Sequence, residues 1–266
     1  MREPHSNALV RYDDIERRLV DRTPAVFLDY DGTLTPIVDR PELAILQPQM
    51  RQTLDALAKR CAVAVVSGRD RAEVETLVGL TSVSYAGSHG FDIVGPRGQR
   101  LVHEAGARSA PVLDRTTEEL DRVIGHIDGC LVERKQFAVA VHYRLVAQHD
   151  RKIVFDVFER IASDHPDLVA TGGKMVLELR PKVEWDKGTA VLWLLEALEL
   201  DTPDVLPIFL GDDLTDEDAF RVTRERGVGI LVAEETKPSH ATYLLKNPEE
   251  ARLLLECLIS TLDRRP

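Results

Sequence analysis

Two carboxylates separated by a single residue are the first feature of this chain that can do chemistry. Asp29 and Asp31 lie in the segment Asp-Tyr-Asp-Gly-Thr-Leu-Thr-Pro (29–36), directly after the apolar run 25–28. That run predicts a buried strand, and open α/β sheets bind ligands at the carboxyl ends of their strands. One carboxylate can attack phosphorus while the other moves protons, and both can lie near a hard cation.

Two other interpretations of this segment have to be weighed. Asp and Gly are common in ordinary turns, and Asp-x-Asp-Gly also opens calcium loops of the helix-loop-helix kind. A calcium loop needs a further Asp or Asn and a distant Glu, whereas residues 33–36 are Thr-Leu-Thr-Pro and a predicted strand comes before. The segment therefore favours catalysis, with a structural turn as the open alternative.

Three further segments place polar side chains where a strand ends or a helix begins. Ser67 follows the apolar run 61–66, Lys187 opens a predicted helix, and Asp212 with Asp213 follows the apolar run 206–210. Phosphoryl transfer depends mostly on positioning and charge neutralisation, for which a hydroxyl, an ammonium group and a magnesium-binding carboxylate are suited.

Each of these segments also has a structural interpretation. Ser67-Gly68 can be a turn, Lys187 a solvated helix start, and Asp212-Asp213 a helix cap. The four segments together, in one order along one predicted sheet, favour phosphoryl transfer more strongly than any of them alone.

The elements that must position these residues alternate between apolar strands and amphipathic helices. Because the strands are apolar on both faces, they predict a parallel sheet covered on both sides. The predicted strands are 25–30, 61–66, 83–86, 206–210, 228–232 and 243–245, and the predicted helices are 48–60, 70–78, 187–200, a segment that ends near 226, and one that begins at 248.

The middle of the chain has a different pattern. Residues 91–94 and 99–102 predict a small hairpin around Gly-Pro-Arg-Gly. The following elements predict an α+β module with an antiparallel sheet: helix 111–127, strands 131–133 and 138–144, helix 151–163, and strands 168–170 and 175–180. We expect a core domain of residues 1–107 and 183–266, with a cap domain of residues 108–182 inserted in it.

Composition narrows the classes of function. The chain has 266 residues, 44% of them hydrophobic and 30% charged, with a net charge of -11. The acidic balance argues against binding to nucleic acid or to an anionic membrane. The three cysteines, Cys61, Cys130 and Cys257, show neither disulfide nor zinc spacing, and the N-terminal segment lacks an apolar signal region. We expect a cytoplasmic protein, with a monomer as the working expectation.

The motif set resembles the haloacid dehalogenase superfamily of aspartate-nucleophile phosphatases, and within it the trehalose-6-phosphate phosphatase family. The resemblance covers about residues 24–262 and is most specific in the cap and in the last acidic motif. The segments that carry it are 29–36, Ser67-Gly68-Arg69, Gly87-Ser88-His89-Gly90, Val141-His142-Tyr143-Arg144, 173–181, Asp186-Lys187-Gly188 and 211–217.

The resemblance implies a Rossmann-like haloacid dehalogenase core with an inserted α+β cap (helix-strand-strand-helix-strand-strand), Mg²⁺ as cofactor and hydrolysis of a sugar phosphate. It also implies roles for residues. Asp29 is expected as nucleophile and metal ligand. Asp31 is expected as general acid/base and, through its backbone carbonyl, as a metal ligand. Asp212 is expected as the third metal ligand with Asp213 supporting it, and Ser67 and Lys187 are expected to bind the phosphate. Arg69, His89, Glu133, Lys135, Arg144, Lys174 and Glu178 are expected to contact substrate. One departure concerns Ser88, where relatives often carry Glu.

Three functions remain to be compared. The resemblance favours a phosphatase that hydrolyses trehalose 6-phosphate to trehalose, the last step of trehalose biosynthesis. The same core also suits a phosphatase for another sugar phosphate, such as sucrose phosphate. A catalytically inactive binding subunit would lack a catalytic carboxylate, and Asp29 and Asp31 are both present.

Overall fold

The computed structural model describes residues 6–96, 98–102, 108–173, 175–183 and 185–265. Contacts between residues divide the chain into two compact units. We call residues 1–101 with 185–266 the core unit, and residues 102–184 the insert unit.

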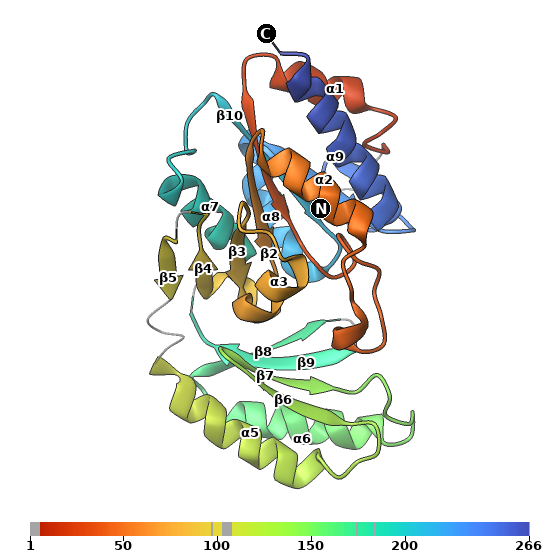
Figure 1. Ribbon diagram of the computed structural model, residues 1–266. Helices are drawn as coiled ribbons and strands as arrows, with labels where there is room; N and C mark the ends of the chain where they lie inside the picture. The colour runs from red at the N-terminus through yellow and green to blue at the C-terminus, as the bar shows by residue number, and fades with distance from the viewer. Residues whose placement is uncertain (1–5, 97, 103–107, 174, 184, 266) are drawn as a thin grey trace. The chain divides into compact units, whose positions relative to one another are not determined.

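The core unit is built on an eight-stranded sheet with the strand order β12-β11-β10-β1-β2-β3-β4-β5 (Figure 1). The strands from β12 to β3 are parallel, and β4 runs antiparallel to β3. Their bounds are β1 (Thr23–Leu28), β2 (Ala62–Val66), β3 (Ser84–Gly87), β4 (Asp92–Val94), β5 (Arg100–Val102), β10 (Val205–Gly211), β11 (Val228–Val232) and β12 (Tyr243–Leu245). The expected parallel α/β sheet is confirmed.

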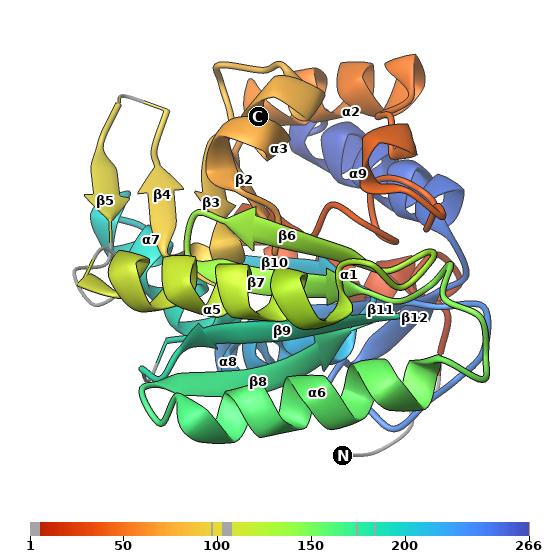
Figure 2. The ribbon, with the colours of Figure 1, turned by 90° about the horizontal axis from the view of Figure 1, so that it is seen from below.

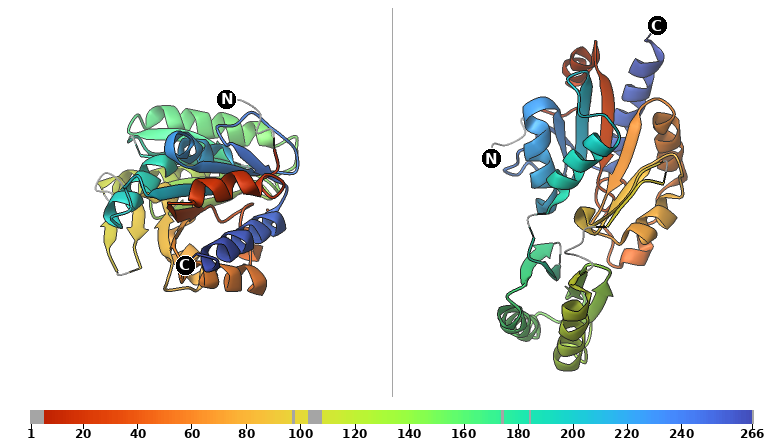
Figure 3. Two further views of the ribbon diagram at one scale, coloured as in Figure 1. Left: turned by 90° about the horizontal axis from the view of Figure 1, so that it is seen from above. Right: turned by 90° about the vertical axis from the view of Figure 1, so that its left-hand side faces the viewer.

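Helices cover both faces of this sheet (Figures 1 and 3). Because successive side chains of a strand point to opposite faces, Val26 and Leu28 pack with the helices of one layer while Ala25 and Phe27 pack with those of the other. The first layer contains α1 (Tyr12–Leu19), α2 (Pro48–Ala58), α3 (Arg71–Val78) and α9 (Pro248–Asp263), and the second contains α7 (Lys187–Ala197) and α8 (Glu217–Arg226).

Helix α1 was not expected from the polar N-terminal sequence. Its buried residues are Ile15 and Leu19, four apart, so they lie on one helix face and pack into the first layer. Asp13 and Asp14 in the first turn and Arg17 and Arg18 in the last match the helix dipole. Because this short helix buries only these two apolar residues, they are too few for a clear sequence pattern.

The insert unit is a four-stranded antiparallel sheet with two helices on one face (Figure 2). Its strand order is β6-β7-β9-β8. Val139, Val141 and Leu179 of the sheet pack against apolar side chains of both helices. The elements are α5 (Ala110–Ile124), β6 (Leu131–Lys135), β7 (Ala138–His142), α6 (Arg151–Asp164), β8 (Leu168–Gly173) and β9 (Val176–Pro181).

Strand β7 is shorter than the expected strand 138–144. It ends at His142, and Tyr143 begins a turn in which its carbonyl accepts a hydrogen bond from the Val146 N–H at 3.1 Å. Arg144 therefore lies in the turn after the strand and does not alternate with Ala140 and His142 along a strand face.

Candidate active site

Asp29 is the first residue after β1 and is nearly enclosed, with 5% of its surface exposed. Its backbone N–H still donates to the Leu210 carbonyl of β10 at 2.9 Å, so the sheet fixes its main chain. Its carboxylate Oδ1 accepts a hydrogen bond from Lys187 Nζ at 2.7 Å. The structure thus brings together the first and third of the segments that the sequence singled out.

Lys187 reaches Asp29 because of the way in which α7 begins. The side chain of Asp186 accepts a hydrogen bond from the Thr189 N–H at 2.7 Å, which caps the helix and makes Lys187 its first residue. Lys187 is 3% exposed, and its ammonium bridges Asp29 and Asp216 at 2.7 and 2.6 Å. Burial lowers the pKa of Lys187, but the carboxylates of Asp216 and Asp29 outweigh it and raise that pKa above its usual value.

Asp216 lies in the motif 211–217, but no role of its own was expected for it from the sequence; the structure gives it a central place in the site. It is fully buried. While Oδ1 accepts from Lys187, Oδ2 accepts from the backbone N–H groups of Asp212 and Asp213, both at 2.9 Å. Asp216 therefore fixes the turn that carries Asp212 as well as the ammonium group.

Three carboxylates in the described part of the chain form a potential cation site. Asp29, Asp212 and Asp216 are all buried and each offers an oxygen, with these atoms within 4.8 Å of one another. Oxygen-only ligands suit a hard divalent cation such as Mg²⁺. Burial raises the pKa of Asp29 well above its usual range, and the carboxylates of Asp216 and Asp212 raise it further against the effect of Lys187. A divalent cation would balance this excess of negative charge, so these residues fit the expected metal.

Asp213 and Asp31, the two other residues expected at the metal site, lie close to these carboxylates. Asp213 is half-buried, and its side chain accepts a hydrogen bond from the Leu214 N–H at 2.7 Å, as part of a capping box with Asp216. Gly32 follows Asp31 with a φ of +86°, and a Cβ on it would lie 2.1 Å from Asp212 Oδ2. Only glycine lets the loop after β1 approach Asp212 this closely.

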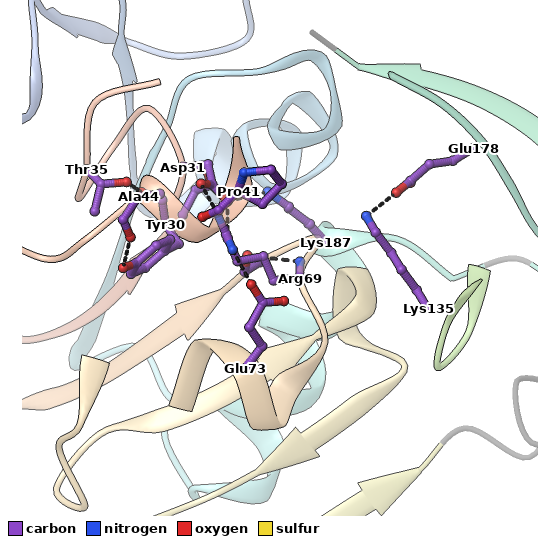
Figure 4. A network of polar contacts seen from close by, with 12 residues as sticks. Tyr30, Asp31, Thr35, Pro41, Ala44, Arg69, Glu73, Lys135, Glu178 and Lys187 are labelled. Carbon is purple, nitrogen blue, oxygen red and sulfur yellow. Dashed lines mark hydrogen bonds and ion pairs between the residues drawn. The ribbon is translucent and has the colours of Figure 1, made fainter. Parts of the chain in front are cut away.

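Arg69 holds Asp31 (Figure 4). Its Nε donates to Asp31 Oδ2 at 2.7 Å and its Nη2 donates to Oδ1 at 2.8 Å. The same guanidinium donates to the Pro41 carbonyl at 2.8 Å, pairs with Glu73, and lies 5.4 Å from the centre of the Tyr30 ring. Through these contacts Arg69 orients Asp31. The contact between Arg69 and substrate that we expect from the sequence stays a prediction.

Ser67 and His89 lie beside this pair. Ser67 follows β2, is almost fully buried, and its Oγ accepts from the Arg69 N–H at 3.1 Å. A hydroxyl that accepts in this way can still donate its own proton. The His89 N–H donates to the Ser67 carbonyl at 2.9 Å. His89 is buried with a φ of +57°, and a Cβ on Gly68 would lie 2.8 Å from its ring, so the two segments are closely packed.

In the insert unit, three predicted substrate residues, Lys135, Glu178 and Glu133, take part in two pairs, and His142 is the fourth member. Lys135 Nζ donates to Glu178 Oε1 at 2.6 Å (Figure 4), and both side chains are largely buried. Glu133 Oε2 lies 2.7 Å from His142 Nε2, and this hydrogen bond lowers the pKa of Glu133. Ala140 is in register with both Glu133 and Glu178, which puts these two glutamates on one face of the sheet. Lys174 lies outside the described residues.

Comparisons with known proteins identify the family. The sequence profile described as trehalose-phosphatase matches residues 27–249. The chain belongs to the trehalose-phosphatase family. Probable trehalose-phosphate phosphatase E of Arabidopsis thaliana is 40% identical over an alignment of 266 positions, which covers 96% of this chain and 75% of the plant protein. The trehalose-phosphate phosphatase of Mycobacterium tuberculosis is 46% identical over 228 residues, which are 85% of this chain but only 58% of the mycobacterial protein.

A solved structure shows the same fold. The C-terminal domain of the Candida albicans trehalose-6-phosphate phosphatase matches with a TM-score of 0.81 at 24% identity, over 97% of this chain and 99% of that one. The expected fold class, a haloacid dehalogenase-like core with an inserted α+β module, is confirmed, and so is the expectation of a phosphoric monoester hydrolase. Within the described chain, none of the helices combines the length and apolar character needed to cross a bilayer.

Asp216 is the residue of the candidate site for which we expected neither catalysis nor metal binding from the sequence. The signal was present in the spacing of Asp212, Asp213 and Asp216 within one turn. That spacing also suits an ordinary cap, and the structure shows the cap. What the spacing alone could not show is that Lys187, from another helix, reaches the same carboxylate.

Proposed function

We propose that this protein is a magnesium-dependent phosphatase that hydrolyses trehalose 6-phosphate to trehalose and phosphate through an aspartyl-phosphate, as the last step of trehalose biosynthesis. The observation that carries the proposal is the buried group of Asp29, Lys187, Asp212 and Asp216 at the carboxyl ends of parallel strands. Family membership adds the substrate class.

In the first step, a carboxylate oxygen of Asp29 attacks the phosphorus of the ester. The phosphorus–oxygen bond to the sugar breaks, and Asp31 gives its proton to the departing sugar oxygen. Lys187 and the Ser67 hydroxyl neutralise and bind the phosphoryl oxygens, on which negative charge accumulates in the transition state. Before substrate binds, Arg69 holds the Asp31 carboxylate in one orientation.

In the second step, Asp31 takes a proton from water, and the water oxygen attacks the phosphorus of the aspartyl-phosphate. The bond from phosphorus to Asp29 breaks, phosphate leaves, and both aspartates return to their starting states. A Mg²⁺ ion held by Asp29, the Asp31 carbonyl and Asp212, with Asp213 and Asp216 in support, would supply the positive charge that the phosphoryl group requires.

The insert unit is proposed as the cap that selects the sugar. A disaccharide is neutral and rich in hydroxyls, so the paired donors and acceptors of Lys135, Glu178, Glu133 and His142 suit it. Arg144 and Lys174 are also proposed to contact the sugar, because the resemblance implies this role.

Two experiments test the proposal. Rapid acid quench during turnover of ³²P-labelled trehalose 6-phosphate should trap label on the peptide that contains Asp29. Hydrolysis in H₂¹⁸O should place ¹⁸O in the released phosphate and none in the Asp29 carboxyl group, because water attacks phosphorus. Absence of trapped label would overturn the aspartyl-phosphate. A panel of sugar phosphates that includes sucrose 6-phosphate should give the highest kcat/KM with trehalose 6-phosphate, and an equal or better value for another sugar would overturn the substrate assignment.

A further inference from the structure

The loop 233–242, between β11 and β12, lies next to the acidic turn of the candidate active site. Strands β10 and β11 are parallel, with Gly211 in register with Leu231. The segments that follow these two strands therefore leave the sheet at the same edge. One of these segments carries Asp212 and Asp216, and the other is the loop 233–242, which has no residue with a role in the proposed reaction.

The loop is fixed to the beginning of α8. Glu217, the first residue of that helix, accepts hydrogen bonds from Ser239 Oγ at 2.6 Å and from the His240 N–H at 2.7 Å. Glu217 and Ser239 are 7% and 2% exposed. The Thr242 N–H also donates to the Gly229 carbonyl of β11 at 2.8 Å. The loop backbone is thus held in place by buried contacts next to Asp216.

From this fixed loop, Lys237 reaches the acidic turn. Its Nζ donates to the backbone carbonyl of Asp212 at 2.7 Å. The N–H of the same peptide group, that of Asp213, donates to Asp216 Oδ2 at 2.9 Å. The peptide that joins Asp212 to Asp213 is therefore held on both sides, by an ammonium group at its carbonyl and by a carboxylate at its N–H.

We propose that Lys237 is a positioning residue that locks this peptide and thereby sets the affinity of the Asp29–Asp212–Asp216 site for its divalent cation. Rotation of the peptide would displace the Asp212 main chain and with it the carboxylate that ligates. The Lys237 ammonium group binds a neutral carbonyl, although the turn also carries the carboxylates of Asp212, Asp213 and Asp216. This contact orients the peptide group and is not an ion pair. The inference rests on the proposed function, because it takes Asp212 as a cation ligand.

The test compares K237M, which keeps the length of the side chain but has neither donor nor charge, with K237R, which keeps both. K246M serves as the matched control, since Lys246 is an exposed lysine on the segment after β12. Each metal-stripped protein is titrated with Mg²⁺ by calorimetry, and amide hydrogen exchange of residues 211–217 is measured without metal. Thermal melts check that each variant is folded, and K237A replaces K237M if the latter does not fold.

Loss of a residue that orients a ligand typically costs about 10–100-fold in metal affinity. We expect K237M to raise the Mg²⁺ Kd about tenfold or more and to speed exchange of the Asp212 and Asp213 amides, with K237R and K246M close to wild type. An unchanged Kd or unchanged exchange in K237M would overturn the inference while leaving the proposed function intact. Failure of the wild-type protein to bind Mg²⁺ would overturn the cation assignment in the proposed function, and the inference with it.

Discussion

Arg69 binds the carboxylate of Asp31 through two parallel hydrogen bonds, at 2.7 Å to Oδ2 and 2.8 Å to Oδ1. This fork geometry fixes both the position and the plane of the carboxylate. Arg69 is itself fixed, because it is 7% exposed and also donates to the Pro41 carbonyl and pairs with Glu73. The residue expected to move protons therefore has a single defined orientation before substrate binds.

We expect R69K to lower kcat for trehalose 6-phosphate by about 10–100-fold with a smaller change in KM, because lysine is a point donor that cannot fix the carboxylate plane. Steady-state phosphate release measures both constants. R71K is a matched control, since Arg71 is another largely buried arginine paired with a buried aspartate, Asp92. Equal kcat values for the two variants would contradict a specific role for Arg69.

We expect K187M to destabilise the metal-free protein by about 3–5 kcal/mol, because it leaves Asp29 and Asp216 buried without their counter-charge. Urea unfolding measures the change. The double variant with D216N should recover part of the loss, since one of the two unpaired carboxylates is then gone. A loss below about 1 kcal/mol, the range of exposed ion pairs, would show that Lys187 is not the counter-ion that the structure indicates.

The raised pKa of Asp29 predicts a pH dependence of stability in the metal-free protein. Burial is the main cause of the shift. Between the unfolded value, about 3.9, and the higher folded value, the folded protein holds a proton that the unfolded chain has released. The contribution of Asp29 to the free energy of unfolding therefore falls as pH rises through this window.

The variant D29N removes this contribution together with the interactions of Asp29 with Lys187, Asp216 and Asp212, while titrating groups that do not interact with Asp29 cancel in the comparison. We expect the free energy of unfolding of wild type minus that of D29N to decrease from pH 4 to pH 7 without metal. Saturating Mg²⁺ should raise the Tm of wild type more at pH 7 than at pH 5. A difference that is flat or increases with pH would contradict the assigned shift.

For the insert unit, we expect E178Q to raise KM for trehalose 6-phosphate about tenfold, because it weakens the charge-assisted hydrogen bond that orients Lys135. The small ester p-nitrophenyl phosphate, which offers no disaccharide, should be hydrolysed with little change in kcat/KM. E119Q is the control from the same unit, because Glu119 lies beside His165 on the helical side. Equal losses with both substrates would contradict a role of Glu178 in sugar selection.

Most of the core fold could be predicted from the sequence because its strands are apolar on both faces and several of its helices carry apolar residues at helical spacing. The expected strand 243–245 coincides with β12, and the helix expected to begin at Pro48 does so. The prediction was less accurate where a local pattern was weak or stopped early. Helix α1 has only two buried apolar residues, and β7 ends at His142 in a turn, two residues before the end of the expected strand 138–144.

The sequence by itself determined which residues follow each strand, and so which carboxylates, hydroxyls and ammonium groups gather at one edge of the sheet. Only the tertiary structure decided which partner each of them has. Arg69 faces Asp31, Lys187 bridges Asp29 and Asp216, and Lys237 binds the Asp212 carbonyl. The physical reason is that strand endings are fixed by short local patterns, whereas these pairings join residues far apart in the chain. Their distances depend on strand order, register and packing, which no local pattern specifies.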